Sequence, residues 1–359
     1  MALKATAVEH IHCDQGEVTG SYLLTPIQQW FFTNNFPENN HWNQSISFEL
    51  KQTVDAGRLN EALNEVCRQH DLLRTRVLPG KAPRYADILP FAYTERLKTV
   101  EIPAHDDYEQ RMQQELTAFQ QSLNLQSGEV FKGLLIVSDT WSSSRLVLTA
   151  HHLVCDAVSF RFIAQDLLNS YQALIDKREI RLPQKTSSFI RWSNAVEAYA
   201  GRHEAVSKKN EWTKEIAAHS RNTKKGRSSA DNLEGDAEQC LFSLSEEDTA
   251  KLMTEVSKNY SIQPIEVMIA ALETMLHERD GADHSIYLES HGRDMLADQV
   301  DLSRTVGWFT NLYPLYFSAD DISNTGATLK KVKDRLAAVQ KRKFEFMLSD
   351  CPREAMDIV

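Results

Sequence analysis

The chain has 359 residues, of which 42% are hydrophobic and 25% charged, a composition typical of globular proteins. Its net charge is -10, and no stretch is dense enough in Lys and Arg to neutralise a row of phosphates, so nucleic acid is not an expected partner. No run approaches the roughly 18 apolar residues that a membrane span needs, so no membrane is expected either. The five cysteines form no CxxC pair, and we expect a cytoplasmic protein without a disulfide framework or a thiolate metal site.

The first half of the chain alternates helix and strand patterns. Pro26 suits the start of a helix, and Ile46, Phe48 and Leu50 alternate as in a half-buried strand. An apolar stripe predicts a helix ending at His70, and the stretch LLRTRVL that follows is typical of a strand. Further expected elements, in chain order, are a surface helix over Tyr108–Leu125, strands over Lys132–Val137 and Arg145–Ala150, and an amphipathic helix over Phe160–Leu174.

A polar stretch, Gly201–Asp236, separates two segments that each carry core-forming patterns, so we place a boundary there. The elements expected beyond it are a strand at Cys240–Ser243, helices over Glu246–Tyr260 and Ile265–Glu278, a strand at Ser285–Glu289 and an apolar stretch over Val306–Phe317. The expected organisation is a tail (1–20), an N-terminal lobe (21–200), a polar linker (201–238) and a C-terminal lobe (239–359).

Two adjacent histidines, His151 and His152, end a predicted buried strand in the stretch HHLVCDAVS. Neighbouring strand residues point to opposite faces, which argues against a two-histidine metal site and favours one working imidazole beside one packed imidazole. Imidazole is the default general base at neutral pH. The alternative is that both are core histidines and that Asp156 only caps the following helix.

The stretch YLESHGRD places a carboxylate, a histidine and an arginine at the end of an apolar strand. Burial would raise the pKa of Glu289 and make it a candidate acid or base. The alternative is a structural ion pair that Arg293 forms with Glu289 or Asp294.

Five motifs together resemble the epimerization domains of nonribosomal peptide synthetases, which belong to the condensation-domain superfamily. In chain order they are TPIQQWFF with HWNQS, HHLVCDAVSF, LPQKTSSFIRW, LESHGRD and SRTVGWFTNLYPL, and the resemblance covers about Leu23–Phe317. It implies a mixed α/β (α+β) fold with two chloramphenicol-acetyltransferase-like lobes in a V arrangement, the second lobe incomplete. Condensation domains share the double histidine but do not usually carry the first and the last two of these motifs.

The resemblance implies that His152 and Glu289 are the acid/base residues, on opposite sides of a tunnel between the lobes. The implied substrate is an aminoacyl or peptidyl thioester on the 4'-phosphopantetheine of a partner carrier domain within adjacent synthetase modules. No metal or bound cofactor is expected, because a thioester acidifies its own α-hydrogen. Supporting roles are expected for His151, Asp156, Arg74, His291 and Arg293. Asp156 is expected to pair with an arginine of its own lobe, and Arg74 is the candidate.

This chain also departs from the family pattern. Ala157 and Ser290 replace glycines, Asp294 replaces a glutamate, and the later PxxGxGYG and FNYLGQF segments are absent. We therefore expect the second lobe to lack strands that complete its sheet. Two alternatives to epimerization stay open: a condensation-type acyltransferase that forms a peptide bond, and a non-catalytic remnant or docking module.

Overall fold

The computed structural model describes residues 11, 13–34, 36–78, 84–104, 107–139, 144–219, 238, 240–256, 258, 261–322 and 324–349. The chain divides into two compact units. Unit 1 comprises Met1–Tyr199 with His291–Thr310, and unit 2 comprises Ala200–Ser290 with Asn311–Val359. Both units mix helices and strands, which confirms the predicted α/β class.

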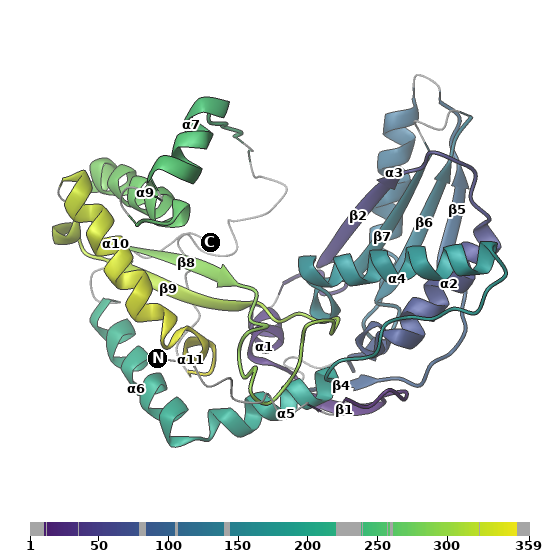
Figure 1. The fold of residues 1–359 in the computed structure, drawn as a ribbon, viewed down its shortest axis with the longest axis horizontal. Helices are drawn as coiled ribbons and strands as arrows, with labels where there is room; N and C mark the ends of the chain where they lie inside the picture. Colours follow the sequence, from purple (N-terminus) through teal and green to yellow (C-terminus); the bar gives the residue numbers. More distant parts are fainter. Residues whose placement is uncertain are drawn as a thin grey trace, which may run out of the picture. The chain divides into compact units, whose positions relative to one another are not determined.

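Unit 1 is built around a four-stranded sheet (Figure 1). Its strands, in the order in which they pair, are β2 (Asn43–Glu49), β7 (Arg145–His151), β6 (Phe131–Val137) and β5 (Leu97–Glu101). The β2–β7 and β7–β6 pairs are antiparallel, and β5 runs parallel to β6. Strands β6 and β7 are almost entirely buried, as expected for a sheet that helices cover on both faces.

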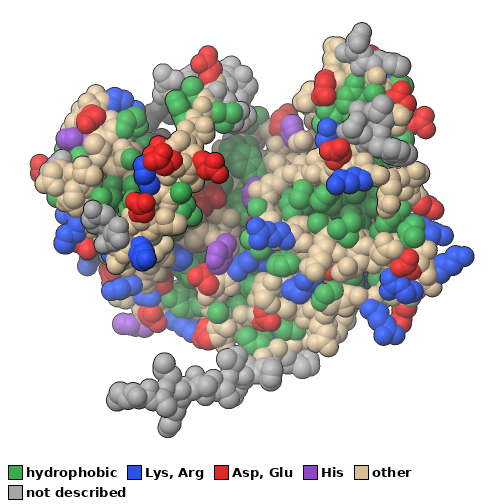
Figure 2. Space-filling model, turned by 45° about the horizontal axis from the view of Figure 1, so that its top comes forward, with side chains coloured by type: hydrophobic (Ala, Val, Ile, Leu, Met, Phe, Trp, Pro, Cys, Tyr) green, Lys and Arg blue, Asp and Glu red, His purple; other side chains and the backbone are tan. Residues whose placement is uncertain are grey.

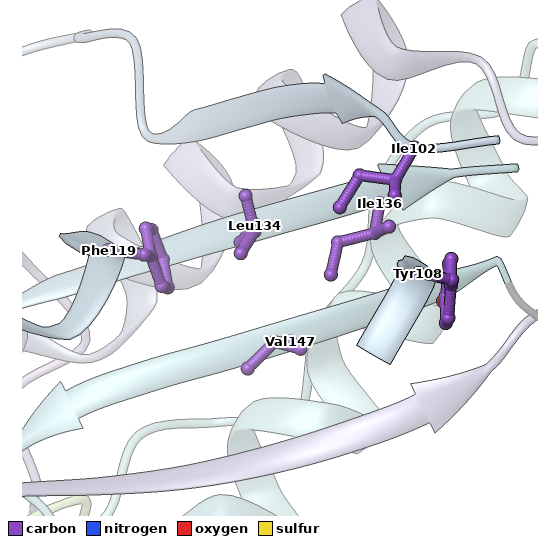
Figure 3. Close-up of a cluster of buried hydrophobic side chains, with 6 residues drawn as sticks. All are labelled: Ile102, Tyr108, Phe119, Leu134, Ile136 and Val147. Atoms are coloured by element: carbon purple, nitrogen blue, oxygen red, sulfur yellow. The ribbon is translucent and has the colours of Figure 1, made fainter. Parts of the chain in front are cut away.

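One face of this sheet packs against α3 (Tyr108–Gln120). Figure 3 shows the buried cluster that joins them, made of Ile102, Tyr108, Phe119, Leu134, Ile136 and Val147. The opposite face packs against α2 (Ala56–Gln69), which lies beside α4 (Ala157–Ile175). Gly133 of β6 allows this close approach, because a Cβ there would lie 2.9 Å from a methyl of Leu63.

The N-terminal part of unit 1 adds α1 and a second sheet. Helix α1 (Pro26–Thr33) begins at the predicted proline, and the Gln28 side chain accepts a hydrogen bond from the Thr25 amide at 3.1 Å. The smaller sheet pairs β4 (Tyr85–Ile88) with β1 (Gly20–Leu23) and β3 (Thr75–Arg76). Two segments complete the unit: the 3-10 turn η1 (Asp71–Arg74) and α5 (Phe189–Ala200).

Unit 2 contains a two-stranded antiparallel sheet, β8 (His284–Ser290) with β9 (Asn311–Phe317). Helices α9 (Pro264–Asp280) and α10 (Thr325–Gln340) pack against each other, and α10 and α11 (Lys343–Met347) contact β9. Helix α6 (His203–His219) packs on α11, where the indole of Trp212 donates a hydrogen bond to the Arg342 carbonyl at 2.7 Å. Further described helical segments of unit 2 are α7 (Glu246–Ala250), which continues as a π-helix over Lys251–Val256, and the 3-10 turn η7 (Ala319–Asp321).

The structure differs from the sequence prediction in several elements. The expected strand at Cys240–Ser243 is wrong, because these residues are exposed and lie outside any strand. The stretch LLRTRVL begins within the turn η1, and only Thr75–Arg76 pair as a strand. The expected linker begins with α6, whose buried Trp212 gives it a packed face. Much of the expected linker, 220–237, lies outside the described residues.

The expected boundaries also differ at the N-terminal tail and within the C-terminal lobe. Residues 13–19, just before β1, are anchored, since the Gln15 side chain donates to the Lys185 carbonyl at 3.0 Å, whereas residues 1–10 of the expected tail lie outside the described residues. The segment His291–Thr310, expected in the C-terminal lobe, belongs to unit 1. Its hydrogen bonds to α4 and to the segment before α5 explain this assignment.

On the face drawn in Figure 2, acidic and basic side chains alternate over the described surface. That face therefore shows no continuous basic stripe of the kind that follows a phosphate backbone. Among the described helices, none combines the length and the apolar character that crossing a bilayer requires.

Candidate functional site

The double histidine lies where β7 gives way to a short 3-10 turn, η3 (His152–Val154). His151 is the last residue of the strand and His152 the first of the turn. The alternation of the strand therefore separates the two rings, and each enters a different environment.

His151 is a packed histidine. Its side chain is fully buried, Nε2 donates to the Asn39 carbonyl at 2.8 Å, and Nδ1 accepts from the Leu153 amide at 3.1 Å. Burial lowers the pKa of His151 to about 4, so the ring is neutral at physiological pH. With both nitrogens engaged, His151 has no free atom for proton transfer.

His152 has the environment of a candidate base. Its Nε2 lies 2.7 Å from the side-chain nitrogen of Gln44, and its ring centroid lies 4.5 Å from that of Trp308. Burial lowers the pKa of His152 below its usual value, although the nearby charge of Asp156 acts in the opposite direction. The ring is therefore neutral near pH 7, which is the form that accepts a proton.

Asp156 has a structural position, as the resemblance implied, but with another partner. It caps α4, and its Oδ1 accepts from the Ser159 amide at 2.7 Å. The Arg293 Nη2 contacts both carboxylate oxygens, at 2.9 and 3.1 Å. The expected pair with Arg74 is therefore wrong.

Arg74 serves a different part of unit 1. It is buried at the end of η1, where it pairs with Asp71 at 2.8 Å and donates to the carbonyls of Leu89 and Val18. These bonds connect η1 to the end of β4 and to the N-terminal segment, and they give the Arg74 guanidinium its hydrogen-bond partners within this part of unit 1. Arg74 was the candidate because it lies in the same expected lobe as Asp156, whereas the observed partner, Arg293, lies 137 residues beyond Asp156.

Arg293 and Ser159 fasten the segment 291–310 to the start of α4. Besides Asp156, the Arg293 guanidinium donates to the Leu302 and Thr305 carbonyls. The Ser159 hydroxyl donates to the Gly307 carbonyl and accepts from the Gly307 amide, both at 3.0 Å. This network holds Trp308, the next residue, against His152.

The segment 291–310 also requires a glycine at position 292. Its φ is +62°, and a Cβ at this position would lie 1.9 Å from the Phe309 carbonyl oxygen. Only glycine fits a left-handed backbone this close to another chain segment. His291, which precedes it, is exposed, and its Nδ1 accepts from the Arg293 amide at 3.2 Å, a contact within this turn.

Glu289 belongs to unit 2, in β8 opposite Leu312 of β9. Among the described residues, no hydrogen bond or ion pair engages its carboxylate, so the alternative of an ion pair with Arg293 is not observed. Partial burial raises the pKa of Glu289 above the usual value for a glutamate. The approach of Glu289 to His152 stays a prediction.

The residues that replace family glycines leave this geometry intact. Ala157 is the first residue of α4 and has negative φ, so the loss of glycine causes no strain. Ser290 pairs with Asn311, and strand alternation directs its side chain away from the face that carries Glu289.

Sequence reasoning missed Gln44, although it lies within the motif HWNQS. A glutamine in a strand carries no chemical signal of its own, and only the β2–β7 register brings it beside His152. Within the part of the chain described, no three His, Cys, Asp or Glu side chains gather as metal ligands. Unit 1 thus carries a neutral imidazole at His152, and unit 2 carries a carboxyl group with a raised pKa at Glu289.

The chain matches the family model "Condensation domain" over residues 18–354. It is 32% identical over 337 residues to surfactin synthase subunit 1 of Bacillus subtilis (strain 168), and 30% identical over 328 residues to bacitracin synthase 3 of Bacillus licheniformis. These matches cover 92% and 90% of this chain but only 9% and 5% of those proteins.

Solved structures show the same fold. The epimerization domain from the third module of tyrocidine synthetase B is 26% identical, with a TM-score of 0.81 over 94% of this chain and 75% of that one. The first condensation domain of the calcium-dependent antibiotic synthetase is 18% identical, with a TM-score of 0.69 over 90% of this chain and 75% of that one.

Proposed function

The chain belongs to the condensation-domain family, and on that premise we propose that it epimerizes the α-carbon of an aminoacyl or peptidyl thioester, from L to D. The substrate is held on the 4'-phosphopantetheine of a partner carrier domain in nonribosomal peptide biosynthesis. The greater likeness to an epimerization domain than to the condensation domain described above supports this choice.

The observation that carries the proposal is that the pKa values of two groups are shifted in opposite directions. The pKa of His152 is lowered, and the pKa of Glu289 is raised, in each case chiefly by burial. One group is therefore poised to accept a proton and the other to donate one, which is how environments assign acid and base roles. Inversion requires that the two groups reach one α-carbon from opposite sides.

The reaction needs only proton transfers. His152 takes the α-hydrogen, the electron pair of the broken C–H bond passes into the thioester as an enolate, and Glu289 returns a proton to the other face. The reverse direction exchanges the two roles. No metal or bound cofactor enters the scheme, because the thioester itself delocalises the charge.

Condensation is the second candidate, because the family model is that of condensation domains and the double histidine is common to both. In that reaction a carrier-bound amine attacks the thioester of a second carrier domain, and a new amide bond forms. It has no evident use for a carboxyl group with a raised pKa at Glu289.

One assay separates these functions. The full chain is mixed in deuterated water with a carrier domain that bears an L-aminoacyl thioester, with and without a second loaded carrier domain. Uptake of α-deuterium and a mixture of D and L products are expected. Amide formation without α-exchange would establish condensation instead, and neither product would mark a non-catalytic module.

A further inference from the structure

Gln44 lies beside His152 because of the pairing between β2 and β7. It pairs with Ala150 in the antiparallel register, two residues before His152. Residues two apart in a strand share a face, so the Gln44 side chain extends toward the position where η3 begins. Its amide nitrogen lies 2.7 Å from the His152 Nε2.

This contact has a defined polarity. An amide nitrogen of glutamine donates and does not accept, so the His152 Nε2 opposite it must be the acceptor. The ring proton then lies on Nδ1. The His152 Nδ1 is buried and has no hydrogen-bond partner among the described residues, so the contact with Gln44 is what sets the tautomer.

We propose that Gln44 is a positioning residue for His152, whose side-chain amide donates to Nε2 and fixes the ring proton on Nδ1. The lone pair is then held on Nε2, the atom that takes the α-hydrogen. The role of Gln44 in proton transfer rests on the proposed function, whereas the hydrogen bond itself does not depend on turnover.

The oxygen of the Gln44 amide can serve the protonated state of the His152 ring. Gln44 Oε1 is buried and has no hydrogen bond among the described residues. When the α-hydrogen passes to Nε2, the C–H bond breaks, an N–H bond forms, and rotation of the amide presents Oε1 as an acceptor to the new N–H. Glutamine can support both protonation states of His152. Leucine could support neither, and glutamate could support only the protonated one.

The charges near His152 are balanced, so a new charge at position 44 would control the pKa of the ring. Asp156 acts on the ring, but Arg293 neutralises its charge at 2.9 Å, and His151 is neutral. A carboxylate in place of the Gln44 amide would therefore be the dominant charge at the ring, and an opposite charge at this range shifts a pKa by about 1–3 units.

The test reads the tautomer and the titration of the His152 ring by NMR of the full chain with ¹⁵N-labelled histidine. The His152 signals are identified by their loss in His152→Ala. The wild-type ring should carry its proton on Nδ1, Gln44→Met should show a mixture of tautomers, and Gln44→Glu should raise the pKa of His152 by about 1–3 units.

Ser47→Glu is the matched control, because Ser47 is exposed on β2 and its side chain faces the other side of the sheet. It adds the same charge and should leave the titration of His152 unchanged. A wild-type ring with its proton on Nε2, or a Gln44→Glu ring that titrates as in the wild type, would overturn the role of Gln44. If the NMR results are as expected but no α-exchange occurs, the proposed function fails while the hydrogen bond stands.

Discussion

At the scale of single residues, burial shifts the pKa values of His152 and Glu289 in opposite directions. Desolvation disfavours the charged form of each, which is imidazolium in one case and carboxylate in the other. The same physical cause therefore favours the neutral form of each group: an imidazole that can accept a proton, and a carboxylic acid that can donate one.

This arrangement predicts a bell-shaped pH dependence for α-exchange. Activity should rise as pH increases through the lowered pKa of His152, because the base must lose its proton. It should fall as pH increases through the raised pKa of Glu289, because the acid must keep its proton. In kcat/KM profiles, the residual activity of Glu289→Gln should lack the alkaline fall, and an unchanged bell in that variant would contradict the assignment.

A second prediction concerns the partner of Asp156. Asp156→Asn leaves the Arg293 guanidinium without its counter-charge and should cost about 3 kcal/mol in the free energy of unfolding. In a double-mutant cycle measured by urea unfolding, Asp156→Asn and Arg293→Met should couple by at least about 1 kcal/mol.

Arg74→Met is the matched control for this cycle. It removes an arginine of the same unit that contacts Asp71, so its effect should add to that of Asp156→Asn within about 0.5 kcal/mol. Strong coupling to Arg74 and none to Arg293 would restore the pairing expected from the sequence.

At the scale of elements, the segment 291–310 determines what surrounds His152. Gly292→Ala would drive a methyl group into the Phe309 carbonyl and displace the neighbouring Trp308. We expect a loss of more than about 2 kcal/mol of stability, together with lower α-exchange activity.

Gly281→Ala provides the comparison, because Gly281 ends α9 with φ of +60° and has open space around its Cβ position. It should cost only the left-handed backbone penalty of about 1 kcal/mol, without a specific loss of activity. Equal effects of the two substitutions in thermal unfolding would show that the contact with Phe309 is unimportant.

Helix α9 carries a buried carboxyl group that the proposed reaction does not use. Glu273 is fully buried, neither side-chain oxygen has a hydrogen bond among the described residues, and burial raises its pKa to about 7. An unfolded glutamate titrates near 4.3. Between these values the unfolded chain releases a proton that the folded unit keeps, so stability falls with rising pH by on the order of 2–3 kcal/mol.

Glu273→Leu should remove this penalty. Its melting temperature should exceed that of the wild type by a margin that grows from about pH 4.5 to pH 7. Glu278→Leu, which changes an exposed glutamate of the same helix, should show no such pH-dependent gain. A constant difference between Glu273→Leu and wild type across this range would mean that Glu273 ionises normally.

The predictable elements are those with long, regular patterns. Helix α9 and strand β8 occur within a residue or two of their expected bounds, because their apolar residues recur at the helix and strand periods. Short strands such as β1 and β4 were missed, since four residues give too little periodicity. The Asp156–Arg293 pair was unpredictable for a different reason, because it joins distant segments through tertiary folding alone.

At the scale of the whole molecule, each unit supplies one candidate catalytic residue. The turn after β7 positions His152 in unit 1, and β8 positions Glu289 in unit 2. The central claim is that inversion requires both groups, one for each face of the α-carbon.

The most direct test measures deuterium uptake and configuration together. A carrier-bound thioester of each configuration is incubated in deuterated water with wild type, His152→Ala or Glu289→Gln, and the released amino acid is resolved by chiral chromatography with mass detection. Wild type should convert either configuration into a deuterated mixture of D and L. Each variant should lose inversion by on the order of 10²–10⁴-fold, with any remaining uptake confined to retained configuration. Inversion at the wild-type rate by either variant would contradict the two-residue mechanism.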